Sequence, residues 1–325
     1  MGDARWTRRD LLRTGVFGAS FVALGASGLL TSCNQSSANN LAFEIEEIRY
    51  GDDPMQVGEL SRPLVDGARP VVVLVHGGYW RVGFTRTAMN DLASDLARVG
   101  YAAWNLDYRR FGELGGGWPG TVEDVAAGID HLHEIASSRR LDTDRVAVIG
   151  HSAGGQLAIW ACARTKAPPD APGAAPLIRP KGVVSLAGVV DLVRSAKSTE
   201  PGGGVELRRA IEDFLAATPD QSPSRYAMAS PTSLLPIGVP QLILHGTADD
   251  RVPLQQSHDY AAAASAAGDP TELLELDGVD HFQVIESTTV WWDRVLAWLA
   301  AIVGDPLGGA NPSSSTTSTT TLPAS

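Results

Sequence analysis

The chain has 325 residues, of which 44% are hydrophobic and 19% charged, and its formal net charge is −11. This composition is typical of a globular protein. The excess of acidic residues argues against a nucleic-acid partner and against binding to anionic lipid by charge alone.

Residues 1–32 have the pattern of an export signal. The basic stretch at 5–13, with the pair Arg8 and Arg9, precedes an uncharged segment at 14–30 that is rich in Gly and Ala. The arginine pair resembles that of twin-arginine signals. The uncharged segment is short for a membrane span, which favours a cleaved signal over an uncleaved helical anchor. Removal of the signal would take the net charge to −13.

The signal ends in LLTSC, which resembles the lipobox of bacterial lipoproteins. We therefore expect cleavage before Cys33, lipidation of that cysteine and a polar tether over residues 33–41. Such a lipid anchor would hold the protein at the outer face of the cytoplasmic membrane; the alternatives are secretion and anchoring by an uncleaved N-terminal helix. Cys162 would then be the remaining cysteine, which leaves no disulfide in a monomer.

The C-terminal residues 305–325 contain an unbroken run of Ser and Thr at 313–321. Such a run buries no apolar surface and predicts a disordered tail, either glycosylated or bare. The span between tether and tail, residues 42–304, has the length of one α/β domain.

Apolar runs of strand length alternate with helical periodicity through this span. We predict strands at 70–76, 101–109, 145–150, 181–188, 240–246 and 271–278, and helices near 89–99, 122–135, 153–163, 207–214, 254–267 and 291–302. The alternation predicts an α/β fold with a mostly parallel central sheet and helices on both faces. In such sheets the chemistry gathers beyond the carboxyl ends of the strands.

One connection is much longer than the others. Residues 189–236 join two predicted strands and contain a helical pattern with Leu207, Ile211 and Phe214. Connections of this length are uncommon in compact domains and are often functional. We expect an insert that caps the site, with a peripheral excursion as the alternative.

The sequence GHSAGG follows the strand at 145–150 and opens a helix. It contains the pattern G-x-S-x-G, with Gly150, Ser152 and Gly154. A tight strand-to-helix turn would expose the Ser152 hydroxyl, and the following helix would offer the N–H of Ala153 to developing negative charge. This context predicts a nucleophilic serine, which needs a base and an orienting carboxylate.

Two later motifs carry a resemblance to the α/β-hydrolases. HGTADDRVP (245–253) resembles that family's H-G-x-x-D-x-x-V-P and places the triad aspartate at Asp249. GVDHFQ (278–283) resembles its G-x-x-H-x and places the histidine at His281. The resemblance covers roughly residues 44–303. Asp250 is the alternative acid, which the motif spacing disfavours.

The stretch HGGYW ends the strand at 70–76, where α/β-hydrolases take a second oxyanion-hole donor. The expected donors are backbone N–H groups of Gly78, Tyr79 and Ala153. Tyr79 and Trp80 are possible pocket residues, although Trp80 is expected to pack beneath the loop. H-G-G-x-W resembles the esterase and lipase group and, with tyrosine in the variable place, kynurenine formamidases.

The leading hypothesis is a serine hydrolase that cleaves a small or aryl carboxylic ester through an acyl-enzyme. The alternative is an arylformamidase that acts on a formyl amide at the same site, and a peptidase or a non-catalytic surface lipoprotein ranks lower. The expected partner is a small-molecule ester or amide. No cofactor is expected and no metal, since no histidine pair has H-x-x-x-H spacing. The oligomeric state is open.

Overall fold

The computed structural model describes residues 40–199 and 203–308. The predicted export signal, Cys33 with nearly all of the tether, and the Ser/Thr run lie outside these residues, so lipidation and export stay predictions from the sequence. No helix in the described ranges is both long and apolar enough to cross a membrane.

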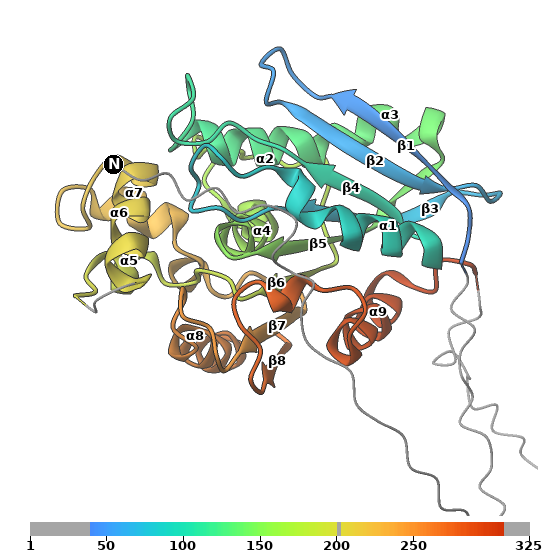
Figure 1. Ribbon diagram of the computed structural model, residues 1–325. Coiled ribbons are helices and arrows are strands. Elements are labelled where there is room, and N and C mark those ends of the chain that lie inside the picture. Colours follow the sequence, from blue (N-terminus) through green and yellow to red (C-terminus); the bar gives the residue numbers. More distant parts are fainter. Residues whose placement is uncertain (1–39, 200–202, 309–325) are drawn as a thin grey trace, which may run out of the picture. The chain divides into compact units, whose positions relative to one another are not determined.

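The described residues form one eight-stranded sheet in the order β1-β2-β4-β3-β5-β6-β7-β8 (Figure 1). The strands are β1 (Phe43–Arg49), β2 (Val57–Pro63), β3 (Arg69–Val75), β4 (Ala102–Leu106), β5 (Leu141–His151), β6 (Gly182–Leu186), β7 (Gln241–Gly246) and β8 (Thr271–Leu276). The β1/β2 and β2/β4 pairs are antiparallel and all other pairs are parallel. The predicted α/β-hydrolase fold with a mostly parallel sheet is confirmed.

Helices cover both faces of the sheet. They are α1 (Asn90–Val99), α2 (Gly120–Asp130), α3 (Leu132–Arg139), α4 (Ala153–Ala163), α5 (Leu192–Ala196), α6 (Gly203–Leu215), α7 (Pro223–Ala229), α8 (Gln255–Ala266) and α9 (Val290–Val303). Short 3₁₀ helices lie at η1 (Arg86–Met89), η2 (Arg164–Lys166), η3 (Pro231–Leu234) and η4 (Gln283–Ile285). α1 and α9 pack on one face, and α2, α3, α4 and α8 pack on the other.

The central strand β3 shows why both faces are apolar. Val71, Val73 and Val75 belong to the cluster beneath α2 and α4, whereas Val72 and Leu74 belong to the cluster beneath α1 and α9. Successive side chains of a strand point to opposite faces, so a strand that is covered on both sides must be a continuous apolar run.

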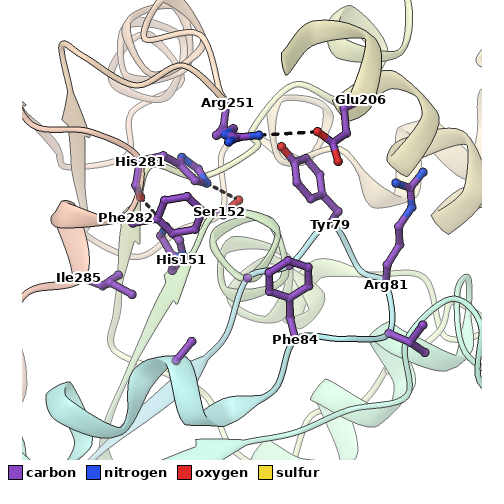
Figure 2. Close-up of a pocket in the computed structure, with 14 residues that line it drawn as sticks. Tyr79, Arg81, Phe84, His151, Ser152, Glu206, Arg251, His281, Phe282 and Ile285 are labelled. Atoms are coloured by element: carbon purple, nitrogen blue, oxygen red, sulfur yellow. Dashed lines mark hydrogen bonds and ion pairs between the residues drawn. The ribbon is translucent and has the colours of Figure 1, made fainter. Parts of the chain in front are cut away.

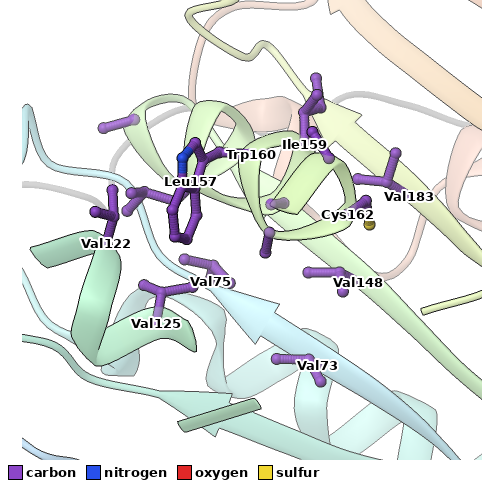
Figure 3. Close-up of a cluster of buried hydrophobic side chains, with 14 of the residues drawn as sticks. Val73, Val75, Val122, Val125, Val148, Leu157, Ile159, Trp160, Cys162 and Val183 are labelled. Carbon is purple, nitrogen blue, oxygen red and sulfur yellow. The ribbon is translucent and has the colours of Figure 1, made fainter. Parts of the chain in front are cut away.

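Helix α4, which follows Ser152, is buried along its whole length. Figure 3 shows Leu157 and Trp160 of α4 facing the valines of α2, with Val75 and Val148 of the sheet close by. Cys162 lies in the same cluster as a free, buried thiol. Because α4 is fixed on the sheet in this way, the turn that precedes it is held rigidly.

The single helix predicted near 122–135 is two consecutive helices, α2 and α3, which meet at His131. The carbonyl of Gly128, the helical partner of the Leu132 N–H, accepts a hydrogen bond from the buried Trp104 indole at 2.8 Å. The Trp104 side chain of β4 therefore competes for this carbonyl at the position where one helix ends and the next begins.

The insert at 189–236 folds into α5, α6, α7 and η3, and its three α-helices gather at one end of the sheet (Figure 1). The ring of Phe214 on α6 stacks on the ring of Trp80, with centroids 4.8 Å apart and planes 7° apart. Since Trp80 follows the carboxyl end of β3, the insert packs against the loops at that end of the strands.

Candidate active site

Ser152 occupies the turn between β5 and α4. Its backbone has φ 56° and ψ −119°, a strained conformation for a residue with a side chain. Glycine at position 154 lets this turn lie directly against β3, because a Cβ there would lie 2.1 Å from the Val75 carbonyl oxygen. The Ser152 N–H donates to the Leu186 carbonyl at 2.9 Å, which ties the turn to β6.

The structure brings together Ser152, Asp249 and His281, which follow β5, β7 and β8. His281 Nε2 is 2.9 Å from Ser152 Oγ, and His281 Nδ1 is 2.7 Å from Asp249 Oδ2. A carboxylate only accepts, so the proton of the neutral imidazole lies on Nδ1. Nε2 is therefore free to accept the hydroxyl proton of Ser152. This chain of bonds is the arrangement that a serine nucleophile requires.

The Asp249 carboxylate is fully buried and has four donors. Oδ1 accepts the backbone N–H groups of Arg251 and Val252 at 2.8 and 2.9 Å. Oδ2 contacts His245 Nε2 at 3.1 Å in addition to His281. Burial raises the pKa of Asp249, but the hydrogen bonds from the two histidines outweigh it and hold that pKa well below its usual range. Asp249 is therefore an anion at neutral pH.

His245, the first residue of the motif HGTADDRVP, is a positioning residue for Asp249. Its Nε2 also lies 3.0 Å from the Val252 carbonyl, and its Nδ1 is 2.7 Å from Ser257 Oγ. One neutral tautomer satisfies every contact, with Nε2–H donating to the two acceptors and Nδ1 accepting the Ser257 hydroxyl. The motif H-G-x-x-D-x-x-V-P contains both this histidine and Asp249. Their fixed spacing in the motif is the sequence feature that could have predicted their contact. Asp250, by contrast, points outward with a side chain that is 75% exposed.

His151 lines the same cavity from the turn itself. Its Nε2 donates to the His281 carbonyl at 2.8 Å, so it holds the loop that carries the base. Burial, with a further contribution from neighbouring His281, lowers the pKa of His151 to about 3. The ring is therefore neutral throughout the physiological range and does not itself exchange protons with substrate.

This buried histidine predicts a specific loss of stability in acid. Between pH 6.5, where an exposed histidine titrates, and about 3, the unfolded chain protonates His151 and the folded chain does not. The free energy of unfolding therefore falls with decreasing pH, by up to about 1.4 kcal/mol per pH unit from this group. We expect His151→Asn to reduce that slope, measured by urea unfolding at pH 7.5 and 5.0. Equal slopes for both proteins would contradict this origin.

The loop after β3, which contains the predicted oxyanion donors Gly78 and Tyr79, has a left-handed backbone at three successive residues. Gly78, Tyr79 and Trp80 have φ values of 115°, 57° and 55°. A Cβ on Gly78 would lie 2.3 Å from the Phe84 side chain, so no larger residue fits there. Opposite this loop, the Ala153 N–H lies in the first turn of α4, where helical N–H groups have no partner within the helix.

Trp80 was expected to pack beneath the loop, with a place in the pocket as the alternative; the structure confirms the packing and corrects the pocket assignment. Its side chain is completely buried and does not line the cavity. The indole N–H donates to Gln156 Oε1 on α4 at 2.9 Å, and the ring stacks on Phe214. Trp80 therefore links the loop after β3 to α4 and to the insert, whereas Tyr79 does line the cavity.

The residues before and after this loop are fixed by the segment that follows β4. The His76 ring stacks on the Tyr108 ring with centroids 4.4 Å apart, and the Tyr108 hydroxyl donates to the His76 carbonyl at 2.8 Å. Burial raises the pKa of Asp107, but contacts with His76 and Arg86 outweigh it and lower that pKa overall. The segment DYRR thus packs against the segment HGGYW and stabilises its position.

Ser152 lies at one wall of a cavity of about 380 Å³ (Figure 2). Its lining is Gly77, Gly78, Tyr79, Arg81, Val82, Phe84, Ala88, His151, Ser152, Glu206, Arg251, His281, Phe282 and Ile285. The walls differ in character. Phe84, Phe282 and Ile285 form an apolar side, and Tyr79, Arg251 and Glu206 form a polar side, with Ser152 between the two in Figure 2.

Within residues 40–199 and 203–308, no group of three or more His, Cys, Asp or Glu side chains is placed to hold a metal ion.

The fold, the strained turn at Ser152 and the hydrogen-bonded Ser–His–Asp set define an α/β-hydrolase. The chain belongs to the BD-FAE family, whose sequence profile matches residues 62–263. That match includes Ser152 and Asp249 and ends before His281.

Known proteins are similar over most of the described chain. Isoprenylcysteine alpha-carbonyl methylesterase ICME of Arabidopsis thaliana is 28% identical over 72% of this chain and 55% of its own length. Probable carboxylic ester hydrolase LipM of Mycobacterium tuberculosis is 30% identical over 61% of this chain and 46% of its own. The chain thus spans about half the length of these relatives.

Among solved structures, esterase B from Lactobacillus rhamnosis superimposes with a TM-score of 0.70. It is 18% identical in sequence, and the superposition covers 82% of this chain and 87% of that one. At this level of identity the likeness concerns the fold alone.

Proposed function

We propose that this chain is a serine hydrolase that cleaves a small or aryl carboxylic ester. The observation that carries the proposal is the hydrogen-bonded chain from Ser152 through His281 to Asp249 at the wall of a cavity. The relatives from A. thaliana and M. tuberculosis are named as esterases, which supports the same reaction class.

In the first half of the reaction, Ser152 Oγ attacks the ester carbonyl carbon while His281 Nε2 takes the hydroxyl proton. The negative charge that forms on the carbonyl oxygen faces the N–H groups of Ala153 and of the Gly78–Tyr79 loop. Asp249 stabilises the imidazolium that results. His281 then gives its proton to the leaving alcohol, and the acyl group stays on Ser152.

In the second half, His281 takes a proton from a water molecule, whose oxygen attacks the acyl carbon. The tetrahedral intermediate is held by the same N–H groups. Its collapse returns the proton to Ser152 Oγ and releases the carboxylic acid. The apolar side of the cavity, with Phe84 and Phe282, suits an alkyl or aromatic group next to the scissile bond.

An arylformamidase is the second candidate, because the same aromatic side chains also suit an aryl formamide and the loop has the sequence HGGYW. The two are separated by kcat/KM for p-nitrophenyl acetate and for N-formylkynurenine, with Ser152→Ala as the blank. We expect faster turnover of the ester and none of either by Ser152→Ala. A higher kcat/KM for the formamide would favour the formamidase, and turnover by Ser152→Ala would contradict both.

A further inference from the structure

The polar side of the cavity contains the hydroxyl group of Tyr79. The Tyr79 oxygen is buried, and it has no hydrogen-bond partner within residues 40–199 and 203–308. Figure 2 shows this oxygen directed toward Arg251 and Glu206. Burial, and then the charge of Glu206, raise the pKa of Tyr79 and outweigh the opposing effect of the neighbouring Arg251 guanidinium, so the hydroxyl keeps its proton at neutral pH. An unpaired buried hydroxyl costs free energy unless a ligand supplies its partner.

Arg251 adds further donors beside this hydroxyl. Its Nη1 is 3.7 Å from Glu206 Oε2 and its Nε is 3.2 Å from Asp250 Oδ1, and neither contact has the geometry of a hydrogen bond. Arg81, on the same wall, differs because it donates to Asp213 at 2.6 Å. The Arg251 guanidinium therefore lies beside the Tyr79 hydroxyl and two partly exposed carboxylates, without a well-aligned hydrogen bond to either carboxylate.

The Arg251 guanidinium and the Tyr79 hydroxyl thus lie together at one side of the cavity, opposite its apolar side. A guanidinium fork matches a carboxylate in shape and charge, and such pairs are among the strongest hydrogen bonds in proteins. We propose that Arg251 and Tyr79 bind a carboxylate on the ester substrate, with the scissile bond at Ser152 and the uncharged end against Phe84 and Phe282. This inference rests on the proposed ester hydrolysis and names its substrate class.

Glu206 gives the proposal a second, opposite test. Its carboxylate is 49% exposed and lies in the first turn of α6, so it is free to turn toward solvent when a ligand carboxylate arrives. While it stays near Arg251 it competes for the same guanidinium. Removing the Glu206 charge is therefore expected to strengthen the binding of an anionic substrate, whereas removing the Arg251 charge weakens it.

The experiment compares an anionic ester with a neutral ester of nearly the same shape. One pair, ethyl hydrogen succinate and ethyl levulinate, places the charge on the acyl side. The other pair, O-acetylglycolate and acetoxyacetone, places it on the alcohol side. The readout is the ratio of kcat/KM for the anionic and neutral members of each pair. Because both rates come from one preparation, any fraction of misfolded variant cancels in the ratio.

We expect the wild-type ratio to exceed one in at least one pair. In that pair it should fall about tenfold in Arg251→Gln, as expected for the loss of a charge-assisted hydrogen bond at a partly exposed site. It should fall less in Arg251→Lys and rise in Glu206→Gln. Arg294→Gln is the matched control, because Arg294 lies on α9, pairs with Glu272 and does not line the cavity.

Equal ratios for wild type and Arg251→Gln in both pairs would overturn the carboxylate site and leave the esterase proposal intact. A fall of the ratio in Glu206→Gln would also overturn it, because that result would mean that Glu206 assists the anion. If Ser152→Ala hydrolysed these esters as fast as wild type, the proposed reaction itself would fail, and the carboxylate site with it.

Discussion

Replacement of Ser152 by alanine is expected to lower kcat for ester hydrolysis by about five to six orders of magnitude. In the proposed reaction Ser152 Oγ forms the acyl-enzyme, and it lies 2.9 Å from His281 Nε2. Without it, only binding and the oxyanion donors are left to act on the substrate. The measurement is the initial rate of p-nitrophenyl acetate hydrolysis against the rate without protein.

Ser185→Ala is the matched control for this substitution. Ser185 lies in β6, is also buried, and its hydroxyl has no hydrogen-bond partner within the described part of the chain. We expect its kcat to equal that of wild type, and the thermal unfolding midpoints of both variants to stay close to wild type. An active Ser152→Ala protein would contradict the assignment of the nucleophile.

Asp249→Asn is expected to lower kcat by about three to four orders of magnitude while the protein stays folded. In the wild type, Oδ1 accepts hydrogen bonds from two backbone N–H groups, and Oδ2 accepts from the ring nitrogens of two histidines. An asparagine has one acceptor oxygen for these two pairs of donors. If its amide nitrogen faces His281, the ring must take the other tautomer, with its proton directed at Ser152, and it then cannot act as a base.

The neighbouring residue supplies the control. Asp250 has the same charge and lies one position away, but its carboxylate is largely exposed and forms an ion pair with Arg251. Asp250→Asn is therefore expected to keep the wild-type kcat on the neutral substrate p-nitrophenyl acetate. Equal losses in the two variants would mean that net charge near the site, and not the orientation of His281, determines the rate.

The sheet is largely predictable from sequence, because strands buried on both faces are continuous apolar runs. The run VVVLV predicts β3, and the structure places its five side chains alternately in the two clusters. The antiparallel strands β1 and β2 give no such signal. In β1, FEIEEIR contains half-buried and exposed residues and none that is buried, as expected of an edge strand, and its pairing with β2 depends on tertiary contacts.

In the candidate site, too, some residues are predictable from the sequence and others are not. Ser152, Asp249 and His281 are each identified by a local motif at a strand end, so their meeting follows from the topology of a parallel sheet. Arg251, Glu206 and Phe84 have no motif of their own. Glu206 reaches the cavity only because α6 packs against the loop after β3, through the stacking of Phe214 on Trp80. A contact between an insert and a distant loop has no signature in one sequence.

The most direct test of the central claim is reaction with a fluorophosphonate probe, followed by intact-mass and peptide mass spectrometry. An activated serine attacks phosphorus and displaces fluoride, which leaves a stable adduct on its oxygen. We predict one adduct per chain, located on the peptide that contains Ser152, and none in Ser152→Ala. An unlabelled wild type, or equal labelling of both proteins, would contradict the assignment of this chain as a serine hydrolase.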